Sequence, residues 1–476
     1  MDTLVIITAL ALPMLLGTSL MNLVVPLRTE GRGALTAGSG ILAGLITLPL
    51  LIRLVNAAGL GLNFAVTAIL CIAVTAVAFL YWLKRRKSDP VLFSLPAETA
   101  DLSRSEILLF AVFIALAAWH LLVPTLELIA RPLYAWDTTM HWATKAKAWF
   151  GRGELTPFVP PQAWLNIGGE GVLTDTNASY PATAPLLQVW MCLAIGRWDE
   201  SIMNLPWAMC FLGLGLAFYG MARAASVKPV IAALFTYFLM SLPLMNIHVA
   251  LAGYADIFVT GTFTVAALAF YLWSVDRQRW QAGIAFAFAF SGPLVKVEGL
   301  LWLATFIPAI AIVLLRWQLS LLFLGFTCGA VALLLVFLPQ DVALAGHSLE
   351  SLLIFYRPRA TEQLIASFWY YGNWNLLAYL VAALPLLVIA INPSDRYQLR
   401  GLLALMVSVV AIFVFLFIYT RFAAGAIRLT GVSRVAMHFV PAMLFLLMLL
   451  VNSKIHASPD EGLDKLTSPD LENPDT

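Results

Sequence analysis

Residues 401–420 read GLLALMVSVVAIFVFLFIYT and contain no charged side chain. A helix of about 20 apolar residues matches the roughly 30 Å hydrocarbon core of a bilayer. Over the whole chain of 476 residues, 61% are hydrophobic and 11% are charged, whereas soluble domains have about 25% charged residues. We therefore predict an all-α polytopic membrane protein.

Apolar runs between polar breaks predict about 13 transmembrane helices. Their expected ranges are 3–26, 37–55, 60–83, 106–127, 205–223, 229–247, 256–274, 281–295, 299–315, 318–338, 374–391, 401–420 and 435–452. Residues 186–195 form a further apolar run that is too short to span, and we expect it at the membrane interface.

The basic cluster Lys84-Arg85-Arg86-Lys87 predicts the orientation, because basic residues in short loops stay on the cytoplasmic side. Alternating the helices from this point places the other basic short loops on the same side. These loops contain Arg28, Arg32, Arg223, Lys228, Arg277, Arg279, Arg316, Arg396 and Arg400. Two long segments, 128–204 and 339–373, are then expected to face outward.

The predicted organisation has four parts. Residues 1–87 form an N-terminal three-helix membrane extension that begins without a basic leader, and 88–105 form a cytoplasmic linker. Residues 106–452 form the main transmembrane module, and 453–476 read as a disordered acidic cytoplasmic tail. The four cysteines have no metal or disulfide spacing, so neither a zinc site nor a disulfide framework is expected.

Basic residues also gather on the expected outer side, which the usual bias of positive charge does not favour. They are Arg53, Arg131, Lys145, Lys147, Arg152, Arg197, Lys296, Arg357, Arg359, Arg421, Arg428 and Arg434. As a set they favour a site for a phosphate or pyrophosphate group, whereas each alone is also compatible with helix-end residues that reach the lipid headgroups.

The stretch from Tyr134 to Phe150 is expected to be an interfacial helix in the first outer segment. Asp137, His141 and Lys145 recur at a spacing of four and share one face, which we expect to meet water. Trp142, Ala146, Trp149 and Phe150 form a second, apolar face that we expect to meet lipid. An alternative reading is that Asp137 only caps the helix and that the lysines are a solvated face.

Five short stretches occur in an order that points to a family. They are Trp136-Asp137 with Lys145-Ala146-Lys147, Tyr180-Pro181 with 185–190, Gly253-Tyr254-Ala255-Asp256, Lys296-Val297-Glu298-Gly299, and Ser433-Arg434. Over about residues 106–452 the chain resembles the bacterial GT-C glycosyltransferases, relatives of the protein mannosyltransferases and of the lipid A aminoarabinose transferase. Ser433 departs from the resemblance, since an acid is expected there, and the three leading helices lie outside it.

The resemblance implies a GT-C module with interfacial helices in its first outer loop. It implies an inverting transfer of a sugar from a polyprenyl-phosphate or pyrophosphate donor to a lipid or glycan acceptor. The expected location is the bacterial inner membrane, with the site facing the periplasm and with membrane lipids, but no nucleic acid, as further partners.

A phosphate leaving group needs no proton, so this chemistry requires one base for the acceptor hydroxyl and cations for the developing phosphate charge. Asp137 is the candidate base, and Asp256 is a second acid that orients the acceptor or helps to bind a cation. Two carboxylates without a third ligand do not define a metal site, so dependence on Mg²⁺ or Mn²⁺ stays open. The candidate phosphate ligands are Lys145, Lys147, Lys296, Arg357, Arg359, Arg421 and Arg434, and His141, Tyr180 and Glu298 are supporting residues.

Several alternatives stay open at this point. Lys296 and Glu298 also read as a purely structural pair, and His141 as a neutral hydrogen-bonding group. The aromatic stretch 368–374 suits either sugar stacking or an interfacial belt. A secondary transporter or a non-catalytic lipid-binding subunit would keep the topology, although a transporter should carry its ionisable residues near mid-membrane.

Overall fold

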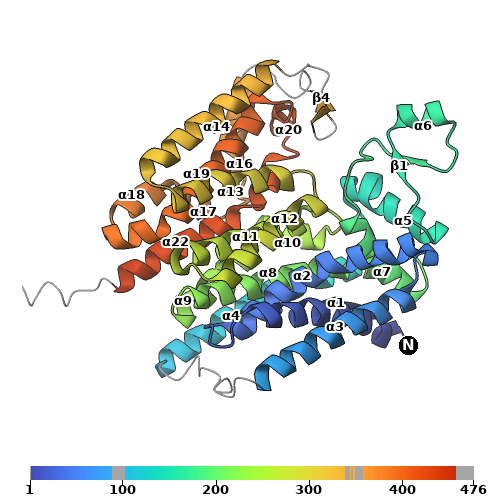
Figure 1. The fold of residues 1–476 in the computed structure, drawn as a ribbon, viewed down its shortest axis with the longest axis horizontal. Coiled ribbons are helices and arrows are strands. Elements are labelled where there is room, and N and C mark those ends of the chain that lie inside the picture. The colour runs from blue at the N-terminus through green and yellow to red at the C-terminus, as the bar shows by residue number, and fades with distance from the viewer. Residues whose placement is uncertain (1, 88–101, 338–342, 345–346, 349–356, 457–476) are drawn as a thin grey trace, which may run out of the picture.

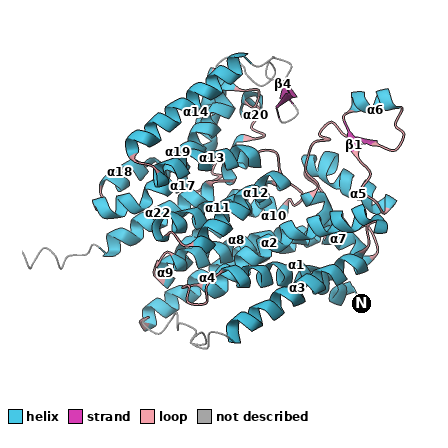
Figure 2. Cartoon of the chain, in the orientation of Figure 1, coloured by secondary structure: helices cyan, strands magenta, loops and turns pink. Residues whose placement is uncertain are grey.

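The structure is a computed structural model that describes residues 2–87, 102–337, 343–344, 347–348 and 357–456. Helices dominate the described chain, and the strands are two pairs of two residues each (Figures 1 and 2). An all-α architecture is therefore confirmed. The tail after His456 and most of the linker 88–105 lie outside the described residues, as do parts of the segment 339–373.

The helices are α1 (Asp2–Val24), α2 (Arg32–Val55), α3 (Phe64–Lys87), α4 (Arg104–Ala130), α5 (Ala143–Arg152), α6 (Pro161–Ile167), α7 (Thr183–Ile195), α8 (Leu205–Ala224), α9 (Pro229–Met240), α10 (Pro243–Ala250), α11 (Asp256–Asp276), α12 (Arg279–Val295), α13 (Gly299–Leu314), α14 (Trp317–Phe337), α16 (Pro358–Trp369), α17 (Leu377–Ala382), α18 (Leu384–Ile389), α19 (Pro393–Tyr419), α20 (Ala423–Ile427), α21 (Val432–Met437) and α22 (Val440–His456). The π-helical turns are η1 (Asn56–Leu60) and η3 (Thr138–Trp142), and η4 (Ile202–Asn204) is a 3₁₀ turn. The strands are β1 (Phe158–Val159) and β2 (Leu173–Thr174), which are parallel, and β3 (Ala343–Leu344) and β4 (His347–Ser348), which are antiparallel.

Among the described residues, 7 helices are long and apolar enough to cross a membrane, and the count is up to 8 if the bent pair α9–α10 is one span. The seven are α1, α2 with η1, α3, α4, α8, α11 and α19. The membrane class is therefore supported, whereas the expected count of about 13 is not reached by helices of full length. Helices α12 and α13 match their expected ranges within two residues but, like α22, are shorter than a full span.

Two expected spans are interrupted where proline enters the helix. The predicted helix 229–247 bends by 58° between α9 and α10, at Pro243. Asn246 donates its side-chain amide to the carbonyls of Met240 and Leu242, 2.7 and 2.9 Å away, and so satisfies backbone groups that the bend frees. The predicted helix 374–391 was wrong as a continuous element, because a turn at Ala383 divides it into α17 and α18 just before Pro385.

The long helices lie side by side, and segments that were expected on one side of a membrane meet at one end of this bundle (Figure 1). At that end Arg223 forms an ion pair with Glu30 at 3.1 Å, and Arg277 donates to the Val313 carbonyl at 2.9 Å. At the opposite end Arg197 pairs with Asp2 at 2.7 Å. The short basic loops that the sequence assigns to one side of the membrane therefore lie at one end of the bundle in the structure.

The three leading helices are packed into the rest of the bundle. Helix α2 contacts α8, α11 and α12, and α1 contacts α7, where the Trp190 indole donates to the Ala9 carbonyl at 2.8 Å. Glycine makes the close approach possible, since a Cβ on Gly38 would lie 2.1 Å from the Ala217 nitrogen of α8. A Cβ on Gly17 of α1 would likewise meet the backbone of Gly40 in α2.

Helix α7 contains the short apolar run 186–195 and packs inside the protein. Residues 183–192 are all buried, and the helix packs against α1, α2 and α5. Its apolar run is short because the helix ends at Gly196, whose positive φ of 71° stops it after 13 residues.

Candidate functional site

Asp256 is the centre of a buried group of charges at the end of the bundle opposite Arg223. It is the first residue of α11, and its side chain is completely buried. One carboxylate oxygen lies 3.0 Å from Lys296 Nζ and 3.1 Å from His438 Nε2, while the other lies 2.9 Å from the Arg434 guanidinium. A carboxylate that loses all its water needs such partners to stay ionised.

Arg434 joins this buried acid to the exposed candidate base. Its second terminal nitrogen lies 2.8 Å from Asp137, whose side chain is 26% exposed. The guanidinium also stacks on the Tyr254 ring, with 4.1 Å between the guanidinium carbon and the ring centroid. Burial by itself lowers the pKa of Arg434, but the carboxylates of Asp256 and Asp137 outweigh it and raise that pKa.

His438 is the member of this group that sequence reasoning missed. The Trp302 indole, which can only donate, lies 2.9 Å from His438 Nδ1, so Nδ1 must accept. The ring proton therefore sits on Nε2 and is donated to Asp256. His438 is neutral in this arrangement, and a single histidine that begins a helical run gives no sequence signal for such a role.

Lys296 completes the group together with Glu298, which lies 3.0 Å from its ammonium. We call Asp137, Asp256, Lys296, Glu298, Arg434 and His438 the charge cluster. It contains three carboxylates and two permanent cations, so its net charge is −1 when His438 is neutral. The Lys296–Glu298 pair of the alternative reading is present, and Lys296 also contacts Asp256.

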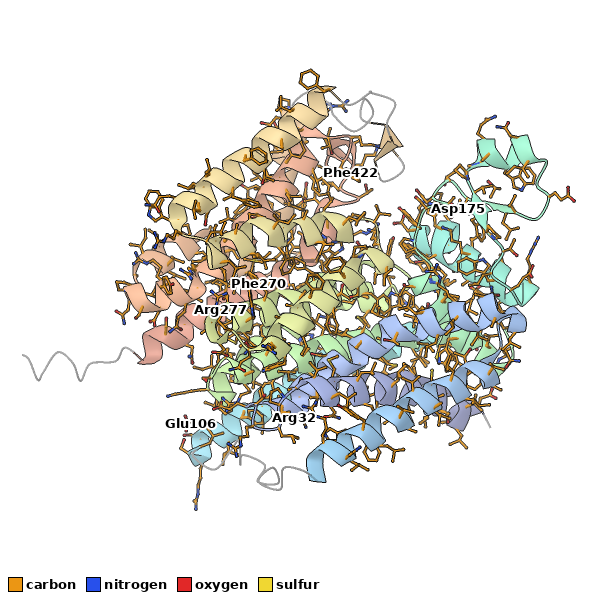
Figure 3. All side chains as sticks on the ribbon, in the orientation of Figure 1. Arg32, Glu106, Asp175, Phe270, Arg277 and Phe422 are labelled. Atoms are coloured by element: carbon orange, nitrogen blue, oxygen red, sulfur yellow. The ribbon has the colours of Figure 1, made fainter. Side chains whose placement is uncertain are left out.

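The first outer segment holds a second polar group around Asp175, which Figure 3 labels beside α5. The Asp175 side chain is 2% exposed and lies 2.8 Å from His141 Nδ1 and 3.4 Å from Lys145 Nζ. The Asn177 side-chain amide lies 2.8 Å from His141 Nε2. We call Asp175, His141, Lys145 and Asn177 the Asp175 hub.

The expectation of an interfacial helix with its lysine in water was wrong for this segment. Lys145 is 1% exposed, and Trp142 and Trp149 pack inside the protein rather than facing outward. The reason is that residues 158–180 fold back over this face, where the ammonium donates to the Asn177 carbonyl at 2.7 Å. Burial lowers the pKa of Lys145, although Asp175 opposes the effect.

Asp137 does not cap the helix that it precedes, so the alternative reading of a simple N-cap is wrong. The first turn, η3, is a π turn, and its Thr138 hydroxyl donates to the Ala252 carbonyl at 3.3 Å. Gly253 has a φ of 106°, and a Cβ there would lie 2.1 Å from Thr138 Cγ2. The glycine therefore allows the turn before α11 to touch η3, and Arg434 contacts both Asp137 and Asp256.

Of the remaining predicted residues, Tyr180 is packed against the first outer segment and the others are exposed. Tyr180 stacks on Trp142 with ring centroids 4.7 Å apart. Burial raises the pKa of Tyr180 to about 12, and four residues of the charge cluster also act on its phenol.

Lys147 is exposed and lies over the Trp198 ring at 5.6 Å. Arg357 and Arg359 are exposed at the start of α16, and Arg421 is exposed in the turn after α19.

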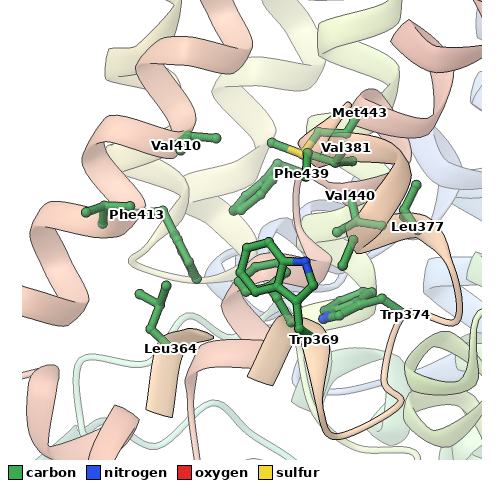
Figure 4. A pocket seen from close by; sticks show the side chains of 14 residues that line it. Leu364, Trp369, Trp374, Leu377, Val381, Val410, Phe413, Phe439, Val440 and Met443 are labelled. Carbon is green, nitrogen blue, oxygen red and sulfur yellow. The ribbon is translucent and has the colours of Figure 1, made fainter. Parts of the chain in front are cut away.

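An apolar cavity of about 310 Å³ lies next to the charge cluster (Figure 4). Its walls come from α16, α17, α19 and α22 together with Trp374 and Phe439. Phe439 follows His438 directly, and Trp302 contacts both of their rings. Phe368, Trp369 and Trp374 of the predicted aromatic stretch line this cavity, and the buried Trp374 indole nitrogen has no hydrogen-bond partner in the described chain.

Within the described ranges, no three His, Cys, Asp or Glu side chains converge in a way that could hold a metal ion. The acids of the charge cluster instead face nitrogen atoms. Searches of family models, of curated proteins and of solved structures gave no match to this chain.

Proposed function

We propose that the protein is a membrane glycosyltransferase that moves a sugar from a polyprenyl-phosphate or pyrophosphate donor to a cell-envelope acceptor. The observation that carries this proposal is the pairing of a partly exposed carboxylate, Asp137, with a cation, Arg434, that a buried carboxylate, Asp256, also holds. The five sequence motifs that resemble GT-C enzymes supply five of the six residues of the charge cluster: Asp137, Asp256, Lys296, Glu298 and Arg434.

In the proposed reaction the acceptor hydroxyl attacks the anomeric carbon, and Asp137 takes the hydroxyl proton. The bond between that carbon and the phosphate oxygen breaks, and the phosphate leaves with the electron pair. Arg434 and Lys296 are the cations at hand for the charge that develops on the phosphate. Attack opposite to the leaving group inverts the anomeric centre.

The two cations can take up a phosphate without leaving Asp256. Lys296 has three N–H donors, of which two face Asp256 and Glu298. Arg434 Nε is buried and has no hydrogen-bond partner in the described chain, so a phosphate would gain this donor only if the side chain moved. Asp256 therefore holds the cations in place, whereas Asp137 is the more accessible acid.

The apolar cavity supports a lipid-linked donor. Its lining is almost wholly apolar, and its volume of about 310 Å³ falls within the usual range for small-molecule sites. Because Phe439 lines the cavity and follows His438 in the chain, we expect a prenyl chain held there to place its phosphate toward the charge cluster. The Trp374 indole would donate to a polar atom of such a ligand.

The test is turnover in membranes that contain the full chain and native acceptors, with a panel of radiolabelled polyprenyl-phosphate sugars. We expect Asp137→Asn to lower the rate by about a hundredfold or more, because the amide keeps the shape but takes no proton. Glu170→Gln, an exposed acid of the same outer segment, is the matched control and should keep the wild-type rate.

Full activity of Asp137→Asn would remove Asp137 as the base. Binding of the polyprenyl-phosphate sugars by the wild type without any transfer would instead favour a lipid-binding subunit. Transfer by the wild type, together with its loss in Asp137→Asn alone, would support the proposal.

A further inference from the structure

The Asp175 hub has no part in the proposed proton transfer, yet it contacts the helix that follows Asp137 of the charge cluster and the backbone of Tyr180. Asp137 stands one turn before His141, and Tyr180 follows strand β2 and Asn177 in the chain. We propose that Asp175 is a positioning residue, which fixes the Asp137 turn and Tyr180 in the arrangement that the proposed reaction needs. This inference rests on the proposed function for its catalytic consequence, but not for its structural one.

The hub fixes the helix that carries Asp137 from its downstream side. His141 and Lys145 are one turn apart on that helix, and both contact the Asp175 carboxylate. Because the Asn177 amide donates to His141 Nε2, the proton of the ring is on Nδ1 and points to Asp175. The upstream side of the turn is held independently by Thr138 against Ala252. Two anchors therefore follow Asp137 along the chain, the Thr138–Ala252 contact and the Asp175 hub.

The same hub fixes Tyr180. The Lys145 ammonium donates to the Asn177 carbonyl at 2.7 Å and to the Tyr180 carbonyl at 3.4 Å, and it lies 5.6 Å from the centre of the Tyr180 ring. Asp175 also accepts the Asn177 backbone N–H at 2.9 Å, which closes the turn before Tyr180. Tyr180 then stacks on Trp142, within the π turn that follows Asp137.

The chemistry of the hub indicates positioning rather than simple stability. A buried Asp–Lys pair gains little net stability, because both charges lose their water, and well-packed apolar side chains of the same size serve a fold equally well. Such a pair does fix one geometry, since any other leaves a buried charge without a partner. Here that geometry fixes the Tyr180 ring against Trp142, in the turn that follows Asp137.

The experiment compares three variants of the full-length protein: Asp175→Asn, the double variant Asp175→Leu with Lys145→Met, and the control Glu170→Gln. The double variant removes both buried charges together, so its Tm should fall less than that of Asp175→Asn, which leaves the Lys145 ammonium without an anionic partner. Hydrogen exchange of residues 134–150, measured on the purified protein in detergent, reports the anchoring without any substrate. We expect faster exchange there in the two hub variants and no change in the control.

Turnover of the polyprenyl-phosphate sugar panel then tests the catalytic consequence. We expect kcat of the double variant to fall by at least about tenfold with KM within about threefold of wild type, since a displacement of about 1 Å costs up to a hundredfold. A double variant with wild-type Tm and wild-type kcat would overturn the positioning role, because a merely structural pair is replaced without loss. Unchanged exchange at 134–150 in both hub variants would also overturn it, even if the wild type transfers none of the sugars.

Discussion

At the scale of single residues, burial separates the two acids that the sequence had put forward together. Asp137 is partly exposed and contacts one cation, whereas Asp256 is buried and contacts two cations and a neutral histidine. An acid with that many donors is a poor proton acceptor, because protonation would break contacts to charges that have no water to replace them. The structure therefore supports different roles for the two carboxylates.

Removing the Asp256 charge should unfold the protein more readily than removing any exposed acid. In Asp256→Asn the buried Lys296 loses an anionic partner, and breaking a buried ion pair in this way costs about 3–5 kcal/mol. We expect a clear fall in Tm when unfolding in detergent is followed by differential scanning fluorimetry. Glu362→Gln, an exposed acid on α16, should leave the Tm unchanged. Equal Tm values for both variants would show that Asp256 is not the structural centre of the cluster.

At the scale of elements, the sequence predicts uninterrupted apolar helices well and broken ones poorly. Helices α8, α11, α12 and α13 fall within two residues of the expected ranges, because their apolar runs decide where a helix can be buried, whereas α19 begins at Pro393, ahead of its uncharged run. The bend between α9 and α10 follows from Pro243, a signal that the apolar count alone does not capture. The buried position of Lys145 could not be predicted, because its partner Asp175 is 30 residues away in a loop without a pattern.

The candidate site shows the same division. Asp256, Lys296 and Arg434 were identified from local motifs, and the structure brings them together. His438 and Asp175 were missed, since each is a lone polar residue whose partners come from distant segments. Spacing along one helix predicts which side chains share a face, but contacts between segments depend on how the helices pack.

The contact between α2 and α8 gives a prediction at this scale. Gly38→Ala places a methyl group about where the Ala217 backbone nitrogen lies, and a helix backbone cannot yield as a side chain can. We expect the variant to lose most of its monodisperse peak in size-exclusion chromatography. Gly325→Ala in α14, where a Cβ meets nothing within 4 Å, should behave as the wild type does. Normal behaviour of Gly38→Ala would mean that the leading helices are not closely packed on α8.

At the scale of the whole molecule, the distribution of charge makes the two ends of the bundle different. One end holds the Glu30–Arg223 pair and the carbonyl contact of Arg277, and the other holds the charge cluster and the Asp175 hub. We infer that the first end faces the cytoplasm, because short basic loops are retained there. The charge cluster would then face outward, where a lipid-linked sugar and a cell-envelope acceptor meet.

Labelling of single cysteines in intact cells decides this orientation. The background carries Cys328→Ser, since Cys328 is the exposed native cysteine of the described chain. We expect Glu170→Cys, in the outer segment, to react with a membrane-impermeant maleimide before the cells are opened. Lys228→Cys, an exposed position between α8 and α9, should react only after permeabilisation. The reverse pattern would place the charge cluster in the cytoplasm and would exclude a reaction at the outer face, whatever the purified protein binds.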